Sequence, residues 1–487
     1  MVSMTNDRRR QWTLALVTAA SLLERADEEL LPAVYKEVGE ALGASPAALG
    51  SLTMYRALVQ AVCYPLAACA AARYDRAGVI AVGAFLWAVA TMLVGVSATF
   101  LQMAIARGFN GVGLALVVPA MYSLVADYSD DSTRGSAFGW LVMASRVGAM
   151  VGGSLGVLLA PTTFLGVAGW RLPFHIVAVF SVALAVTTWF LASDPRPAKT
   201  SKKTTAKVAK ELILEAKDVM RVPTFQILVA QGVAGSVPWS ALTFAAMWLE
   251  LVGFTHWQTT AITNLNVLAG ALGALFSGYI GDPMARRFPN AGRIALAQVS
   301  TASTIPIAAV LLLALPNDPS AGAAYAAVFF VLGFVMPWCP AATNNPILAE
   351  IVPDNARTTV YALDRFFETI LSSFAPTLVG ILAEQVFGYK PASSGAAVVE
   401  NERENAAALA RAVFAEVAVP MAVCCITYSL LYCTYPADRQ RAQMAADLVA
   451  EYEQDSENPV AATPVTVDSI NQALLAKFCQ KGPPAPV

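Results

Sequence analysis

The sequence predicts an all-α membrane protein with twelve transmembrane helices, arranged as two six-helix pseudo-repeats. The 487 residues are 57% hydrophobic and 14% charged, with a mean hydropathy of +0.56, whereas a soluble domain carries about 25% charged residues. Twelve apolar runs approach or exceed the length that crosses a bilayer, which is about 20 residues. Charged loops after the second and fourth runs have counterparts after the eighth and tenth.

The expected spans divide into two groups of six, separated by a polar, lysine-rich segment. In order, we expect them at residues 12–34, 47–72, 78–98, 100–124, 136–160, 169–192, 223–247, 258–281, 292–315, 321–349, 358–385 and 410–435. The expected domains are a cytoplasmic N-terminal segment, an N-terminal half, a cytoplasmic linker, a C-terminal half and a cytoplasmic tail, at residues 1–11, 12–192, 193–222, 223–435 and 436–487.

The distribution of Lys and Arg predicts the orientation of the spans. Of the 32 such residues, 22 fall on the side that carries both ends of the sequence. Cytoplasmic loops of membrane proteins are enriched in these residues. We therefore expect an integral, multi-pass membrane protein with both termini in the cytoplasm.

Charged residues inside the first half predict a polar pathway. A charge at the bilayer centre costs about 3 kcal/mol or more and needs a partner or water. Arginines outnumber acids here, which predicts a cavity for an anionic headgroup or carboxylate. The alternative is that the arginines pair with acids such as Glu28 only to hold the bundle together. The candidate pathway residues of this half are Glu24, Arg25, Asp27, Arg56, Arg107 and Arg146.

The eleventh span carries a second charged cluster, formed by Asp364, Arg365 and Glu368. Asp364 and Glu368 are four residues apart and share a helical face. A carboxylate at this depth suits a proton carrier. Arg365 points elsewhere, and we expect another helix to satisfy it. The alternative for Asp364 and Arg365 is a place in a cytoplasmic gate.

Acidic and basic residues recur at matching loops of the two halves. Asp127 and Arg134 are seven residues apart after the fourth span, as Glu350 and Arg357 are after the tenth. Pairs between the halves would lock the cytoplasmic side when the carrier faces outward. The general enrichment of cytoplasmic loops in arginine would explain Arg286 and Arg287 without a gate. The candidate gate residues are Asp75, Arg76, Gly78, Asp127, Arg134, Gly278, Asp282, Arg286, Arg287, Glu350 and Arg357.

Glycines in the fourth and fifth spans predict close helix packing, because helices approach where side chains are absent. They are Gly111, Gly113, Gly148, Gly152 and Gly153.

The order of these motifs resembles the major facilitator superfamily over nearly the whole chain. The loop signature Gly-x-x-x-Asp-Arg-x-Gly-Arg-Lys is met in part after spans two and eight, and the span-four signature Arg-x-x-x-Gly-x-Gly is complete. The resemblance implies the major facilitator fold and links Arg107 with proton coupling. The matching residues are Asp75, Arg76, Gly78, Gly278, Asp282, Arg286, Arg287, Arg107, Gly111 and Gly113.

Within the superfamily, the first two spans resemble the Spinster branch. The resemblance rests on Glu24-Arg25, Leu31-Pro32, Tyr55 and Pro65-Leu66. It implies a carrier of lysolipids or sphingoid lipids, often coupled to protons. The branch usually has Asp where this chain has Glu24.

These observations predict a secondary active transporter that works by alternating access, is proton-coupled and moves an anionic or zwitterionic organic solute, with a lysolipid as a candidate. The alternatives are a non-transporting receptor on a carrier fold and a facilitator of small organic anions. Two histidines and no HExxH motif argue against an enzyme. No phosphate-loop motif is present, so we expect that ATP does not power the protein directly. We expect a monomer that meets a small-molecule or lipid substrate and membrane lipids, with no cofactor, metal or nucleic acid.

Overall fold

The computed structural model describes residues 6–128, 134–164, 166–194, 213–214, 216–352, 357–390 and 398–456. Within these ranges, nine helical segments are long and apolar enough to cross a membrane. The other three predicted spans are helical too. They are α1 (Asn6–Ala33), α3 (Pro46–Arg73) and the segment formed by α13 (Gly322–Val335), η5 (Cys339–Asn344) and α14 (Asn345–Glu350). The predicted all-α membrane architecture is therefore confirmed.

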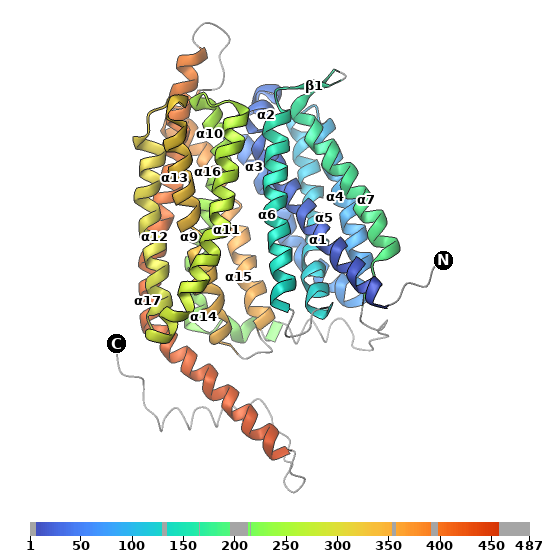
Figure 1. Cartoon of the computed structure of the whole chain (residues 1–487), viewed down its shortest axis with the longest axis vertical. Coiled ribbons are helices and arrows are strands. Elements are labelled where there is room, and N and C mark those ends of the chain that lie inside the picture. The colour runs from blue at the N-terminus through green and yellow to red at the C-terminus, as the bar shows by residue number, and fades with distance from the viewer. Residues whose placement is uncertain are drawn as a thin grey trace.

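The first helix group runs from α1 to α7 (Figure 1). Its main contacts join α1 to α6, α3 to α5, and α4 to both α5 and α7. The strands β1 and β2 form a small antiparallel pair between α6 and α7. The remaining elements are α2 (Tyr35–Leu42), α4 (Arg76–Val96), α5 (Phe100–Tyr128), α6 (Arg134–Leu159), β1 (Thr163–Phe164), β2 (Val167–Ala168), η1 (Gly169–Arg171) and α7 (Leu172–Leu191).

The second helix group runs from α9 to α17. In it, α17 packs along α9 and α12, and α11 packs on α13. Its remaining elements are α9 (Pro223–Ala241), η2 (Leu242–Phe244), α10 (Ala245–Val252), α11 (His256–Arg287), α12 (Gly292–Ala309), η3 (Val310–Ala314), η4 (Pro319–Ala321), α15 (Arg357–Ser372), α16 (Ala375–Ile381), η7 (Leu382–Val386) and α17 (Val398–Ser456).

Prolines interrupt several spans of the second group. Pro238 lies three residues before α9 gives way to η2, and Pro340 lies inside the π-helical segment η5. Pro376 stands at the start of α16, just after α15 ends. Proline removes a backbone donor and crowds the preceding turn, so a helix bends or breaks there. These spans are consequently built from shorter helices joined at a bend.

The two helix groups meet at one end of the bundle. We call this the hairpin end, since it carries α2 and the β1–β2 pair; at the opposite tail end, α1 begins and α17 runs past the other helices (Figure 1). At the hairpin end, α16 packs against the start of α3. A Cβ added at Gly380 would lie 2.2 Å from the amide nitrogen of Ala47, and one at Gly50 2.3 Å from the carbonyl oxygen of Pro376. The backbones of α3 and α16 are therefore in close contact at these glycines, and this contact closes the hairpin end.

Polar contacts reinforce this closure. The ammonium of Lys36 on α2 lies 3.1 Å from a carboxylate oxygen of Glu402 on α17. The amide of Ala47 donates to Glu384 at 2.8 Å. The predicted linker and tail lie largely outside the described residues, so the predicted domain boundaries stay predictions.

Candidate functional site

A cavity of about 680 Å³ lies between the two helix groups. Its volume is in the range of sites that enclose small organic ligands, roughly 300–1,000 Å³. Side chains of α1, α3, α5 and α6 line it from one group, and those of α9, α11, α13, α15 and α16 from the other. The charged residues among them are Glu24, Arg25, Glu28, Glu29, Arg56, Arg146 and Arg365.

A network of ion pairs covers one wall of this cavity. Glu28 accepts hydrogen bonds from Arg25 on the same helix and from Arg56 on α3, whose Nη2 lies 2.5 Å from Glu28 Oε1. Arg25 also contacts Glu29 at 2.8 Å, and Arg56 donates to Gln60. The sequence predicted both arginines as pathway residues, whereas Glu28 was named only as the structural partner of the alternative interpretation. Its spacing of three from Arg25 was the signal for the first contact.

Two charged residues of the cavity wall stand apart from this network. Glu24 on α1 and Arg146 on α6 make no hydrogen bond or ion pair with any residue that the structure describes. Both line the cavity. One acid and one arginine are thus available to a solute that enters from water.

Asp27 and Arg107 lie behind the wall instead of lining it. Asp27 is 1% exposed and accepts hydrogen bonds from Thr91 and from Asn110, the latter at 2.9 Å. Arg107 is equally buried, and its Nε and Nη2 atoms have no hydrogen-bond partner among the described residues. Asp27 and Arg56 both lie close enough to act on its charge. These two predicted pathway residues therefore form a buried layer beside the cavity.

Glycines set the spacing of the helices that carry these charges. A Cβ at Gly148 would lie 2.1 Å from the carbonyl oxygen of Leu22, and one at Gly152 2.2 Å from that of Ala26. Gly111 meets the backbone of α3 and Gly113 that of α4 in the same way. Gly153 differs, because it faces open space and lines the cavity.

Asp364 and Glu368 lie in a smaller pocket that adjoins the cavity wall, together with Arg365. Asp364 is 4% exposed and makes no ion pair with a described residue. Arg365 Nη1 lies 3.0 Å from Glu368 Oε2. The expectation that another helix would satisfy Arg365 was therefore wrong. Its long side chain reaches the residue one turn further along α15.

At the tail end, two candidate gate residues of the first helix group, Asp75 and Arg76, have partners within that group. Asp75 caps α4 by accepting from the amide of Gly78 at 2.9 Å. Arg76 is fully buried and donates through Nε to Asp194 at 2.8 Å. Asp194 follows α7, so this ion pair ties the start of α4 to the end of α7.

In the second group, too, candidate gate residues pair within their own group, around Arg293 on α12. This arginine lies 3.2 Å from Asp282 and 3.7 Å from Glu350, and Arg439 on α17 lies 3.2 Å from Glu350. Asp194, Arg293 and Arg439 were not predicted from the sequence as partners. All of these pairs lie within one helix group. The predicted pairs between the halves belong to the state in which the cytoplasmic side is closed, so they stay a prediction.

The other candidate gate residues are exposed or fall outside the description. Arg286 and Arg287 are exposed at the end of α11, and a Cβ at Gly278 would meet nothing within 4 Å. The side chains of Asp127, Arg134 and Arg357 lie outside the described residues, so their predicted pairing stays a prediction.

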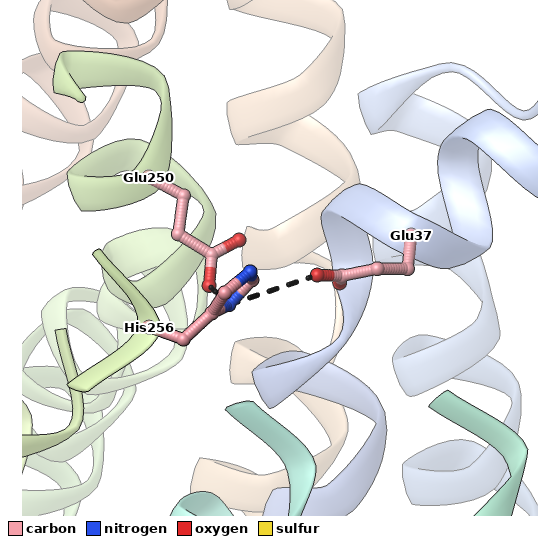
Figure 2. A group of neighbouring side chains, drawn as sticks. All are labelled: Glu37, Glu250 and His256. Atoms are coloured by element: carbon pink, nitrogen blue, oxygen red, sulfur yellow. Dashed lines mark hydrogen bonds and ion pairs between the residues drawn. The ribbon is translucent and has the colours of Figure 1, made fainter. Parts of the chain in front are cut away.

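A third cluster joins the two groups at the hairpin end. Nδ1 of His256 lies 2.8 Å from Glu250 and 4.0 Å from Glu37 (Figure 2). Burial, together with the nearby Glu250 carboxylate, raises the pKa of Glu37 to about 7.

A polar cavity between two groups of membrane-spanning helices defines a polytopic membrane transporter. The chain belongs to the Major Facilitator Superfamily, whose family model matches residues 17–376. The predicted resemblance to this superfamily is thus confirmed.

The chain is also similar to individual transport proteins. The chain is 24% identical over 382 residues to a cis,cis-muconate transport protein of Acinetobacter baylyi, covering 76% of this chain and 88% of that protein. It is 25% identical over 388 residues to an MFS-type efflux pump of Mycolicibacterium smegmatis, covering 78% and 86%. Its fold is similar to a bacterial homologue of the human lysosomal transporter Spinster, solved in an inward-facing, unoccupied conformation. That match has a TM-score of 0.74 and 20% identity, and covers 89% of this chain and 99% of the other.

Proposed function

We propose that this protein is a secondary active transporter that moves an anionic or zwitterionic organic solute by alternating access. The observation that carries the proposal is the cavity between the helix groups, where Glu24 and Arg146 make no hydrogen bond or ion pair with a described residue. Membership of the superfamily supplies the transporter class. The charged residues of the cavity indicate the class of solute.

The balance of charge in the cavity favours an anion. Four arginines and three glutamates line it, and Arg25 and Arg56 are already held by the glutamates of α1. Arg146 pairs with no described residue, so its guanidinium can bind a ligand. A guanidinium binds carboxylate or phosphate through two parallel hydrogen bonds, which fixes the orientation of the bound group.

Glu24 is our candidate for proton coupling. A carboxylate without a charged partner inside a membrane span is costly when ionised, and taking up a proton removes that cost. Binding of an anion at Arg146 and of a proton at Glu24 would load the same cavity with compensating charges. Asp364, in the smaller pocket, is the second candidate, and Arg107 could act on the proton site through its buried charge.

Two solute classes fit this site. An amphiphile such as a lysolipid agrees with the resemblance of the first two spans to the Spinster branch and with the similar fold of the bacterial Spinster homologue. A small dicarboxylate agrees with the similarity to the muconate transport protein. A facilitator that moves such anions without protons is the alternative mechanism.

The ion pairs at the tail end support a gating role. With the hairpin end closed, Arg76 and Arg293 pair within their own helix groups. When the tail end closes, the loops that carry Asp75 and Asp282 would come together, and these pairs would exchange for pairs between the groups. The excess of Lys and Arg at this end orients it, and both termini, toward the cytoplasm. We take the monomer as the working unit.

The test is uptake by proteoliposomes that hold the purified protein. A labelled lysophospholipid and labelled cis,cis-muconate would be offered with and without a pH gradient, to wild type, Glu24→Gln and the exposed control Glu40→Gln. We expect gradient-driven uptake of one solute that Glu24→Gln loses and Glu40→Gln keeps. Uptake that ignores both the gradient and Glu24→Gln would reject coupling, and uptake of neither solute would reject both solute classes.

A further inference from the structure

Three potential metal ligands converge at the hairpin end from elements that are distant in the sequence. Glu37 lies on α2, Glu250 on α10 and His256 at the start of α11, and their side chains point toward one another (Figure 2). One donor atom from each lies within 4.8 Å of the others. The sequence predicts no metal site, since no ligand spacing links these residues.

Among the described residues, no cation other than His256 contacts these two carboxylates. The side chain of Glu250 is 4% exposed and that of Glu37 15% exposed. The Oε2 atom of Glu37 is buried and has no hydrogen-bond partner among the described residues. A protonated His256 would neutralise only one of the two carboxylates. The neighbouring cation, Lys36, is already paired with Glu402.

Buried carboxylates that face one another require a cation or hydrogen-bond donors. We propose that Glu37, Glu250 and His256 bind a divalent transition-metal ion of the Zn²⁺ type, which bridges the two helix groups.

The donor set selects this class of ion. One imidazole nitrogen and two carboxylate oxygens suit Zn²⁺, which binds both at about 2.0–2.2 Å, whereas Mg²⁺ and Ca²⁺ favour oxygen ligands. Two donors on one tetrahedral ion of that size stand about 3.4 Å apart. The distances from His256 to Glu250 and to Glu37, 2.8 and 4.0 Å, lie on either side of this value. Three protein ligands leave a fourth position for water.

A bound ion would hold the hairpin end closed. Glu37 belongs to the first helix group and the other two ligands to the second, so the complete ligand set exists only while the groups touch at this end. A ligand that binds one state stabilises that state by mass action. Inhibition of transport by Zn²⁺ would follow, and that consequence rests on the proposed function. The binding of Zn²⁺ to these three residues does not depend on the proposed function.

The test therefore measures binding with the purified full chain, free of a histidine tag, in detergent. Zn²⁺ affinity would be determined by competition with a chromophoric chelator for wild type, Glu37→Gln, Glu250→Gln and His256→Asn. The control is His175→Asn, because His175 is the other of the two histidines and contacts Met92 away from the cluster. Only variants with the wild-type elution profile in size-exclusion chromatography are compared.

We expect one tight Zn²⁺ per chain in wild type and His175→Asn, with affinity at least about tenfold weaker in the three ligand variants. Zn²⁺, but not Mg²⁺, should raise the melting temperature of wild type and leave that of His256→Asn unchanged. Equal affinity in wild type and all ligand variants would overturn the proposal. Failure of wild type to bind micromolar Zn²⁺ would overturn it without any variant, whatever the outcome of the transport assay.

Discussion

Glu28 on α1 and Arg56 on α3 form an ion pair across the wall of the central cavity, with Arg56 Nη2 2.5 Å from Glu28 Oε1. Arg56 is 5% exposed and Glu28 27% exposed. The same carboxylate also holds Arg25. One acid therefore fixes two arginines and joins two helices. Glu24 and Arg146 line the same cavity and pair with no described residue, so a solute meets them without breaking this network.

Replacing Glu28 should destabilise the protein more than replacing its neighbour. Glu28→Gln leaves Arg56 buried without its acid, and loss of one partner of a buried pair costs about 3 kcal/mol. Glu29→Gln leaves Arg25 paired with Glu28, so it serves as the matched control. Thermal melting in detergent should show a larger fall for Glu28→Gln. Equal melting temperatures would mean that water, not Glu28, compensates Arg56.

A methyl group at Gly380 should open the hairpin end. It would lie 2.2 Å from the Ala47 amide, and the backbone on both sides leaves no flexible atom to yield. Gly380→Ala should raise the labelling of cysteines introduced near the hairpin-end mouth of the cavity. Gly278→Ala is the control, since its methyl group would meet nothing within 4 Å. Labelling at the same rate in both variants would show that the α3–α16 contact does not hold this end closed.

Removal of the Arg76 guanidinium should destabilise the first helix group. Arg76→Gln removes the guanidinium from a buried ion pair with Asp194, which is 8% exposed, and breaking a buried pair costs about 3–5 kcal/mol. The exposed control Arg287→Gln should change stability by about 0.5 kcal/mol or less. Melting of both variants in detergent tests this. A normal melting temperature for Arg76→Gln would argue that its pairing with Asp194 contributes little in this state.

The positions of the spans could be read from the sequence because bilayer thickness fixes their length and hydropathy. The ends of the helices could not be read from the sequence, and α17 is an example. The predicted span covers 410–435, whereas the helix runs from Val398 to Ser456. Hydropathy reports which part of a helix meets lipid, and the polar turns beyond it are invisible to that signal.

Which charges lie near the cavity was predictable, but their partners were not. Asp27 lies three residues after Glu24, yet it hydrogen-bonds to α4 and α5 while Glu24 lines the cavity. Successive helical positions are about 100° apart, so the direction of each side chain depends on which helices are neighbours. Arg293 was missed for the same reason, because its partners come from α11 and the end of α14.

The central claim is that Arg146 binds the anionic group of the solute, and the KM of uptake by Arg146→Gln proteoliposomes tests it most directly. A hydrogen bond to a charged group contributes about 1.5–3 kcal/mol, so its loss should raise the KM about tenfold or more. The control is Arg403→Gln, an exposed arginine on α17 outside the cavity, whose KM should equal that of wild type. An unchanged KM in Arg146→Gln would contradict the account.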